Sequence, residues 1–153
     1  MNTESRLEKM KYSNGQCKLC NTGETENIDH LMMGCRHNKI IWELLERIIQ
    51  MVFGRFYKID LVATIFGFWS VNDTQSPSDI EIINVLMGIC RYHIWKIRNC
   101  IKYENEKISI TQSVSRLKIE LNLHLQTLLF SHSTCQIIKE KLEIVQIYMK
   151  DVL

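Results

Sequence analysis

The sequence predicts a mainly α-helical fold with a small Cys/His-rich unit at its N-terminus. The chain has 153 residues but only one proline and six glycines, so it has few of the turn residues that separate strands and form hairpins. Apolar residues recur at helical spacing in four separate stretches. Three cysteines and one histidine fall between Cys17 and Cys35. A chain of this length fits one domain, so we expect a small knuckle followed by about four amphipathic helices.

The Cys/His-rich unit has the pattern C-x2-C-x9-H-x4-C, formed by Cys17, Cys20, His30 and Cys35. The first pair fits a tight turn that aims both sulfurs at one point, and the second fits a short helical turn that breaks at Gly34. Structural zinc takes four such thiolate and imidazole ligands. The alternative is a reduced cysteine pair beside a core histidine. Because this small loop has little else to hold it together, we predict one Zn²⁺ on these four residues.

Two other sets of side chains compete for the role of ligand. His37 lies two residues beyond Cys35, but its ring would have to turn back from the start of the next helix. Cys90 and Cys100 lie ten positions apart on one predicted helix, about 15 Å along its axis, so they cannot share a metal or a disulfide. Cys135 stands alone. We predict that these cysteines are small core residues.

The first long helix is predicted after Cys35 and ends near Gly54. The second begins at Ser76 and Pro77, with Ser78 and Glu81 as a capping box, and ends near Glu104. The apolar positions of these two helices are Ile41, Leu45, Ile48 and Val52, and then Ile83, Met87, Cys90, Ile94, Ile97 and Ile101.

Two further helices follow similar signals. Ser109 with Gln112, and Ser133 with Gln136, form capping-box patterns before periodic apolar runs. Those runs are Val114, Leu117, Leu121, Leu125 and Leu128, and then Ile138, Leu142, Val145, Met149 and Val152. The stretch "DLVATIFGFWSVND" stays open between a short helix and an irregular buried loop, since Gly67 interrupts its apolar run.

A boundary, if there is one, falls after Gly54. It would separate residues 1–54, with the knuckle and first helix, from a helical remainder, 55–153, which we expect to pack as one unit with the knuckle. The formal net charge is only +2, too small by itself to indicate a polyanionic partner. The sequence shows neither a membrane-length apolar run nor a secretory signal, so we expect an intracellular protein with reduced thiols.

Catalysis is not expected. Four protein ligands would leave zinc no open position for water. The sequence contains no P-loop, no G-x-S-x-G, no H-E-x-x-H and no Gly-rich dinucleotide turn. Cys90 and His93 lie close together on one predicted helix, but no third partner is evident, so a buried pair is the simpler interpretation.

The stretch "CKLCNTGETENIDHLMMGCRHNKIIW" resembles the zinc-binding domain at the C-terminal end of non-LTR (LINE-type) retrotransposon reverse transcriptases. In that family a Cys-x2-Cys pair precedes a Glu-Thr element, a His followed by hydrophobic residues, a last Cys and a Trp seven positions on. The matching residues here are Cys17, Cys20, Glu24, Thr25, His30, Leu31, Cys35 and Trp42. The later stretch "GICRYHIWKIRNCIKYENEK" is similar to the "IWK-x-RN"-like helix that follows the knuckle in this family.

The resemblance implies a non-catalytic module that assists a reverse transcriptase in engaging RNA or target DNA. It does not imply polymerase activity, because the chain has no paired-aspartate motif. A second possibility is a zinc-stapled helical scaffold that docks onto a polymerase body or another protein. Phe66, Phe68 and Trp69 could contribute to such a docking surface, although a position in the buried core is the simpler interpretation for each.

The helix "RYHIWKIRNCIK" is the candidate nucleic-acid contact. Arg91, Arg98 and Lys102 are spaced by seven and four, with Trp95 between them and Lys96 to one side. These five residues form either a solvated helix face with Trp95 in the core, or a phosphate-contacting stripe whose ring stacks an unpaired base of RNA or single-stranded DNA. Trp42, by contrast, is predicted to be structural and to cover the zinc loop.

Overall fold

The computed structural model describes residues 3–11, 14–54, 57–68, 76–131 and 136–152. Within these ranges the chain forms helices and an isolated antiparallel bridge between Gln16 and Thr25, but no strand. The predicted mainly α class is therefore confirmed. The elements are α1 (Glu4–Lys9), the π-helical turn η1 (His30–Gly34), α2 (Arg36–Phe53), α3 (Leu61–Phe66), α4 (Pro77–Tyr103), α5 (Ile110–Phe130) and α6 (Gln136–Val152).

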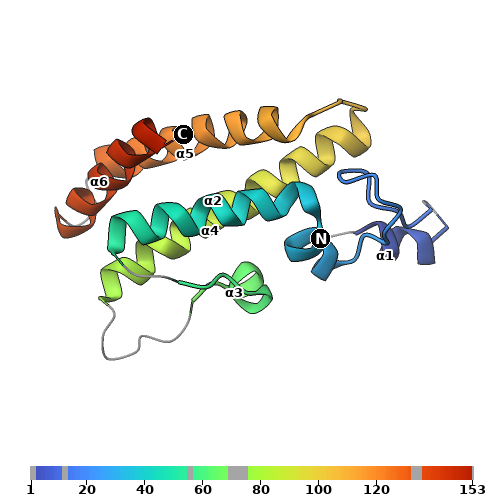
Figure 1. The fold of residues 1–153 in the computed structure, drawn as a ribbon, viewed down its shortest axis with the longest axis horizontal. Coiled ribbons are helices and arrows are strands. Elements are labelled where there is room, and N and C mark those ends of the chain that lie inside the picture. The colour runs from blue at the N-terminus through green and yellow to red at the C-terminus, as the bar shows by residue number, and fades with distance from the viewer. Residues whose placement is uncertain (1–2, 12–13, 55–56, 69–75, 132–135, 153) are drawn as a thin grey trace.

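The long helices pack in two layers. Figure 1 shows α2 and α4 running side by side along the molecule, with α5 and α6 covering one side of them. The Cys/His-rich unit and α1 lie at one end of this bundle, while α3 lies on the side away from α5 and α6. η1 packs against both α2 and α3, so the small unit is joined to the helical body through the start of α2.

α2 has the bounds that its sequence predicts. Its inner face buries Ile41, Leu45 and Ile48 at the predicted spacing of four and three. The helix ends at Gly54, which adopts the left-handed conformation at φ 64° and donates its N–H to the carbonyl of Gln50. A glycine at this position ends a helix without steric cost.

The capping predictions had different outcomes. α5 begins with the predicted reciprocal box, in which the Ser109 hydroxyl accepts from the Gln112 N–H and the Gln112 side chain accepts from the Ser109 N–H. α4 begins at Pro77 as predicted, but its N-cap is Ser76 and the box with Ser78 was wrong. Ser78 lies inside the first turn, where its hydroxyl contacts that of Ser76. The box predicted at Ser133 lies outside the described residues.

The short helix α3 settles one alternative left open by the sequence. Asp60 caps it by accepting a hydrogen bond from the Ala63 N–H at 2.8 Å, and Gly67 ends it at φ 85°. α1 was not predicted, because its six residues are mostly charged and show no apolar period. Only tertiary contacts, described below, explain why this segment folds.

The predicted structural role of Trp42 is confirmed by its burial and its hydrogen bond. Its side chain is 2% exposed, and its indole N–H donates to the carbonyl of Met32 in η1 at 2.5 Å. A ring of this size, buried and hydrogen-bonded, fixes η1 against α2. Among the described helices, none is both long enough and apolar enough to cross a membrane.

Candidate metal centre

The first two predicted ligands lie at the base of a short hairpin-like loop. The Cys17 N–H donates to the carbonyl of Glu24 at 2.9 Å, and the Glu26 N–H donates to the carbonyl of Gly15 at 2.9 Å. These bonds flank the bridge between Gln16 and Thr25. They close the loop that carries the Cys-x2-Cys turn and bring it back beside the segment that leads to His30.

The other two predicted ligands are spaced by the π-helical turn η1. The Cys35 N–H donates to the carbonyl of His30 at 2.6 Å, five residues back, in place of the four residues of an α-helix. The Asn27 side chain accepts from the His30 N–H at 2.7 Å and so anchors the start of the turn. The predicted short helical turn before Gly34 is thus present, with a wider coil that places His30 and Cys35 beside each other.

The four predicted ligands meet at one point. One donor atom from each of Cys17, Cys20, His30 and Cys35 lies within 4.8 Å of the others. The Cys17 and Cys35 sulfurs are 3.9 Å apart, and the Cys20 sulfur is 3.4 Å from His30 Nε2. A tetrahedral zinc with Zn–S near 2.3 Å and Zn–N near 2.0–2.1 Å has S–S and S–N edges of about 3.8 and 3.5 Å. The residues therefore fit the ion in both chemistry and spacing.

Backbone donors surround the two buried sulfurs. The N–H groups of Leu19 and Cys20 point at the Cys17 sulfur, and those of His37 and Asn38 point at the Cys35 sulfur. Hydrogen bonding to Cys35, together with burial, raises the pKa of Cys17, while the same bond to Cys17 lowers the pKa of Cys35. Zinc bound between these sulfurs would hold both as thiolates, because zinc binds the deprotonated form of cysteine.

A carboxylate orients the imidazole ligand from outside. Glu24 Oε2 lies 3.1 Å from His30 Nδ1, so the ring presents Nε2 to the thiol group. The Thr22 hydroxyl lies 3.0 Å from the Cys20 sulfur and 3.2 Å from the same Glu24 oxygen. Carboxylate–histidine–zinc arrangements of this kind fix the histidine tautomer. Glu24 belongs to the Glu-Thr element of the resemblance, and the structure gives that element a physical role.

Glu24→Ala is expected to weaken zinc binding by about 10-fold, at the low end of outer-shell effects, because the Glu24 side chain is 61% exposed. Competition with a chromophoric chelator measures this change. Asp29→Ala is the matched control, since Asp29 is an exposed carboxylate next to His30 whose side chain forms no cap hydrogen bond. If Glu24→Ala and Asp29→Ala bind zinc with equal affinity, Glu24 does not support the zinc site.

The remaining cysteines and His37 lie elsewhere. His37 is buried at the start of α2 and is not part of the four-ligand group. Cys90 is a core residue, as predicted, and burial raises the pKa of its thiol to about 12. Cys100 is only half-buried and lies with Glu104 and Glu106 in a second group of close donor atoms. Glu106 in that group is paired with Arg116 at 3.0 Å. Cys135 lies outside the described residues.

The predicted basic stripe on α4 is not one surface. Arg98 is 3% exposed, and its guanidinium donates to the buried Glu26 carboxylate at 2.8 and 3.1 Å and to Glu4 at 3.3 Å. Lys102 also pairs with Glu4. Although burial opposes the charge of Arg98, the carboxylates of Glu26 and Glu4 raise its pKa. Arg98, one of the predicted phosphate contacts, therefore lies in the interior, because two carboxylates from the N-terminal unit cover this face and helical spacing alone cannot show them.

The other three stripe residues lie apart from this cluster. Arg91 donates to the carbonyl of Ile65 at 2.7 Å and so holds the end of α3. Lys96 forms a salt bridge with Glu120 at 2.6 Å. Trp95 is 42% exposed and its ring lies 5.9 Å from that of Tyr92, so it is not the core residue of the simpler interpretation.

His93 has the third partner that the sequence did not reveal. Its Nδ1 lies 2.7 Å from Glu120 and its Nε2 lies 3.2 Å from the Ser113 hydroxyl. The distances match a Ser–His–Glu triad, but Ser113 is 1% and His93 0% exposed in the α4–α5 interface, where a substrate carbonyl cannot reach the hydroxyl. Burial outweighs Glu120 and lowers the pKa of His93. The network therefore joins two helices.

Comparison with known families decides what the Cys/His unit is. A family model described as zinc-binding in reverse transcriptase matches residues 1–42. Residues 1–42 are therefore similar to the zinc-binding domain of reverse transcriptases. The metal of this domain is Zn²⁺, and the predicted resemblance is confirmed. No curated protein and no solved structure matches the chain.

The match ends at Trp42, inside α2. The zinc-binding domain thus includes α1, the knuckle loop, η1 and the first turns of α2. The residues that neutralise its buried carboxylates, Arg98 and Lys102, lie on α4, beyond the matched segment.

Proposed function

We propose that this chain is a non-catalytic zinc-binding module that binds RNA or single-stranded DNA on behalf of a reverse transcriptase. The observation that carries the proposal is the charge on the outside of the zinc-binding unit. Among described residues 3–39, six basic side chains are exposed, against three exposed carboxylates. The basic residues are Arg6, Lys9, Lys11, Lys18, Arg36 and Lys39, and the acidic ones are Glu8, Glu24 and Asp29.

This surface is basic because two carboxylates of the unit face inward. Glu4 and Glu26 are each 1% exposed and are neutralised by α4. The near-neutral total charge of the chain conceals this local excess. Exposed lysine and arginine side chains can contact the phosphates of a nucleic acid. Each contact favours binding, because it releases counterions that were condensed on the phosphates.

The family assignment of residues 1–42 supports the same proposal, since a reverse transcriptase acts on nucleic acid. A four-ligand zinc site also supports a non-catalytic role, because it leaves no position for an activated water. We therefore propose that zinc shapes the binding surface and takes no part in a reaction.

A salt titration tests the proposal. The zinc-loaded full chain is titrated into a fluorescent 12-nucleotide U-rich RNA at several salt concentrations. The logarithm of the association constant is expected to fall linearly with the logarithm of salt, by about 0.7 for each phosphate contact. Bovine serum albumin at the same concentration is the negative control. An RNA that stays free at low salt would contradict nucleic-acid binding.

A second candidate function, protein docking, is favoured by the outer face of α5 and α6. Ile119, Leu123 and Phe130 are 62%, 56% and 83% exposed and follow one another along α5. Ile137, Ile144 and Ile147 of α6 are 58%, 41% and 59% exposed. Phe66 of α3, also exposed, lies on another part of the fold, and Trp69 lies outside the described residues. Exposed apolar residues along a helical hairpin suit a helix of the polymerase body.

A further inference from the structure

We propose that one unpaired nucleotide is seated in a groove between the zinc knuckle and the connection from α4 to α5. This inference rests on the proposed nucleic-acid binding and locates the binding site on the molecule. The groove consists of two adjoining cavities of about 340 and 230 Å³. The first cavity lies between Lys18 of the knuckle and Lys107 of the connection, and the second adjoins it where both are lined by Leu19, Ile108 and Ser109.

The charge at the rim of the groove suits a phosphate. Lys18, Arg36 and Lys107 are exposed, and among the described residues none of the three forms a salt bridge. The opposing carboxylate, Glu106, is paired with Arg116 at 3.0 Å. Three unpaired cations around one opening therefore favour an anionic ligand. With three thiolates, the zinc centre itself carries a formal charge of about −1, so the phosphate belongs at the lysine rim and not beside Cys20.

The walls of the groove suit a base. Leu19, Ile101 and Ile108 line the first cavity and are each only partly buried. Apolar walls with polar groups at the edge are typical of sites that hold a flat ring, and unpaired bases are recognised in this way. Asn21 and Gln112 line the same cavity, and the Gln112 side-chain NH₂ is not used by the capping box, which uses its oxygen.

One residue that lines the second cavity has a buried polar atom without a hydrogen-bond partner among the described residues. His37 lines this cavity, its side chain is 4% exposed, and its Nε2 forms no hydrogen bond among the described residues. A polar side chain in this state beside the cavity favours a ligand with polar groups over a purely apolar one.

The groove is a better candidate than the predicted stripe on α4. Two of the stripe cations, Arg98 and Lys102, are used by buried carboxylates, and two others, Arg91 and Lys96, are engaged with α3 and Glu120. Within the part of the chain that the structure describes, the groove cations Lys18, Arg36 and Lys107 form no salt bridge. The interface is thus assigned to the knuckle end of the molecule, where the basic surface of the zinc-binding unit meets α5.

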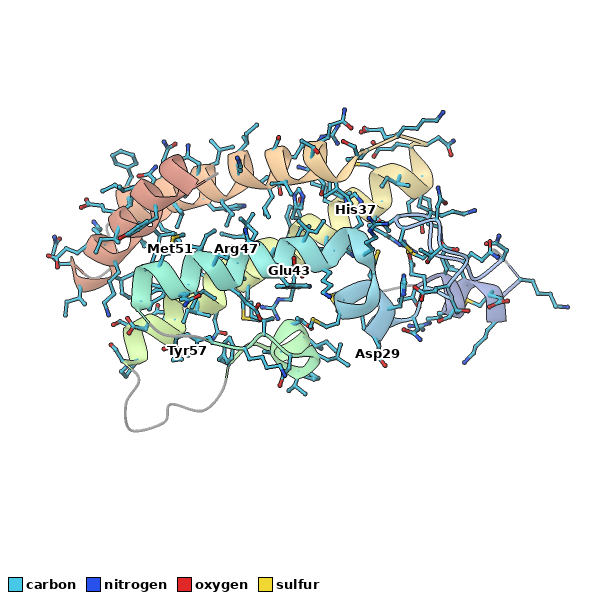
Figure 2. The ribbon with its side chains drawn as sticks, in the orientation of Figure 1. Asp29, His37, Glu43, Arg47, Met51 and Tyr57 are labelled. Carbon is cyan, nitrogen blue, oxygen red and sulfur yellow. The ribbon has the colours of Figure 1, made fainter. Side chains whose placement is uncertain are left out.

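The test compares two double variants of the zinc-loaded full chain against the 12-nucleotide RNA at 0.1 M salt. Lys18→Ala with Lys107→Ala removes the rim cations. Each lost phosphate contact is expected to cost about 5-fold, so affinity falls by about 25-fold and the salt slope by about 1.4. Arg47→Ala with Lys58→Ala is the control, because it removes the same charge from exposed positions away from the groove. Figure 2 shows Arg47 well along α2 from His37.

The outcomes separate this inference from the function on which it rests. A parent chain that does not bind the RNA contradicts both. A parent chain that binds, with equal losses in the two double variants, leaves nucleic-acid binding intact and overturns the groove. A third measurement uses an abasic oligonucleotide of equal length. Weaker binding of the abasic strand is expected if a base enters the cavity, and equal binding would overturn the nucleotide seat. Zinc content is measured in every variant. If the Lys18→Ala, Lys107→Ala variant loses zinc, the comparison is made with Lys107→Ala alone, because Lys18 lies between two zinc ligands and Lys107 does not.

Discussion

Removal of zinc is expected to unfold the knuckle, residues 14–35, while most of the helical signal stays. The loop is held by a few backbone hydrogen bonds and by η1, and apart from Leu31, Met32 and the two inner cysteines it buries little apolar surface. Structural zinc supplies on the order of 10 kcal/mol of folding free energy in such units. Most of the hydrophobic core is built by α2, α4, α5 and α6, and the knuckle adds only Leu31 and Met32 to the fully buried cluster, so circular dichroism should change little.

Hydrogen exchange of residues 14–35 with and without a chelator measures this effect, and metal analysis should find one zinc per chain. Cys35→Ser is expected to lose the metal. Cys100→Ser is the matched control, because Cys100 is a half-buried cysteine outside the four-ligand group. Knuckle amides that remain protected in metal-free protein would contradict the prediction, as would loss of zinc from the control.

Arg98→Met is expected to destabilise the protein by about 3–5 kcal/mol. The change removes the guanidinium that pairs with both buried carboxylates, Glu26 and Glu4, and a buried carboxylate that loses its partner carries a cost of this size. Chemical denaturation followed by tryptophan fluorescence measures the change in the free energy of unfolding. Arg116→Met is the control, since its salt bridge with Glu106 is exposed and should contribute less than about 1 kcal/mol.

A rescue distinguishes the lost charge from lost packing. The double variant Arg98→Met, Glu26→Gln removes one buried carboxylate charge together with the guanidinium and keeps the pair of Glu4 with Lys102. It should recover much of the stability, because a neutral buried group needs no counterion. If the double variant is no more stable than Arg98→Met, the effect of Arg98 is steric and the charge argument fails.

The sequence predicted local features well, because each depends on residues close together in the chain. The bounds of α2, the cap of α5 and the spacing of the four zinc ligands are of this kind. The burial of Arg98 could not be predicted, because its partners Glu26 and Glu4 lie 72 and 94 positions away in the sequence. The "IWK-x-RN" stretch marked the residue as part of a recurring pattern, but its basic spacing indicated a surface and the structure shows an interior.

The Ser113–His93–Glu120 network was missed for the same reason. Its members come from two helices whose pairing is set by the apolar faces of α4 and α5, not by a motif. Helix α1 was missed for a related reason, because contacts with residues far away in the sequence hold it in place. Glu4 lies in it, and the buried pairing of Glu4 with Lys102 and Arg98 holds this charged segment in place. A carboxylate that sequence reasoning assigns to solvent is here part of the interior.

The position of Arg98 has a consequence for transferring the zinc-binding unit between proteins. The segment that recurs as a family ends at residue 42, yet its buried carboxylates obtain their cation from residue 98. A chimera that carries residues 1–42 on a foreign helical body would fold well only where that body offers an arginine at the matching place. Exchange of the zinc-binding unit between related chains should therefore be tolerated when the knuckle and this later helix come from the same parent.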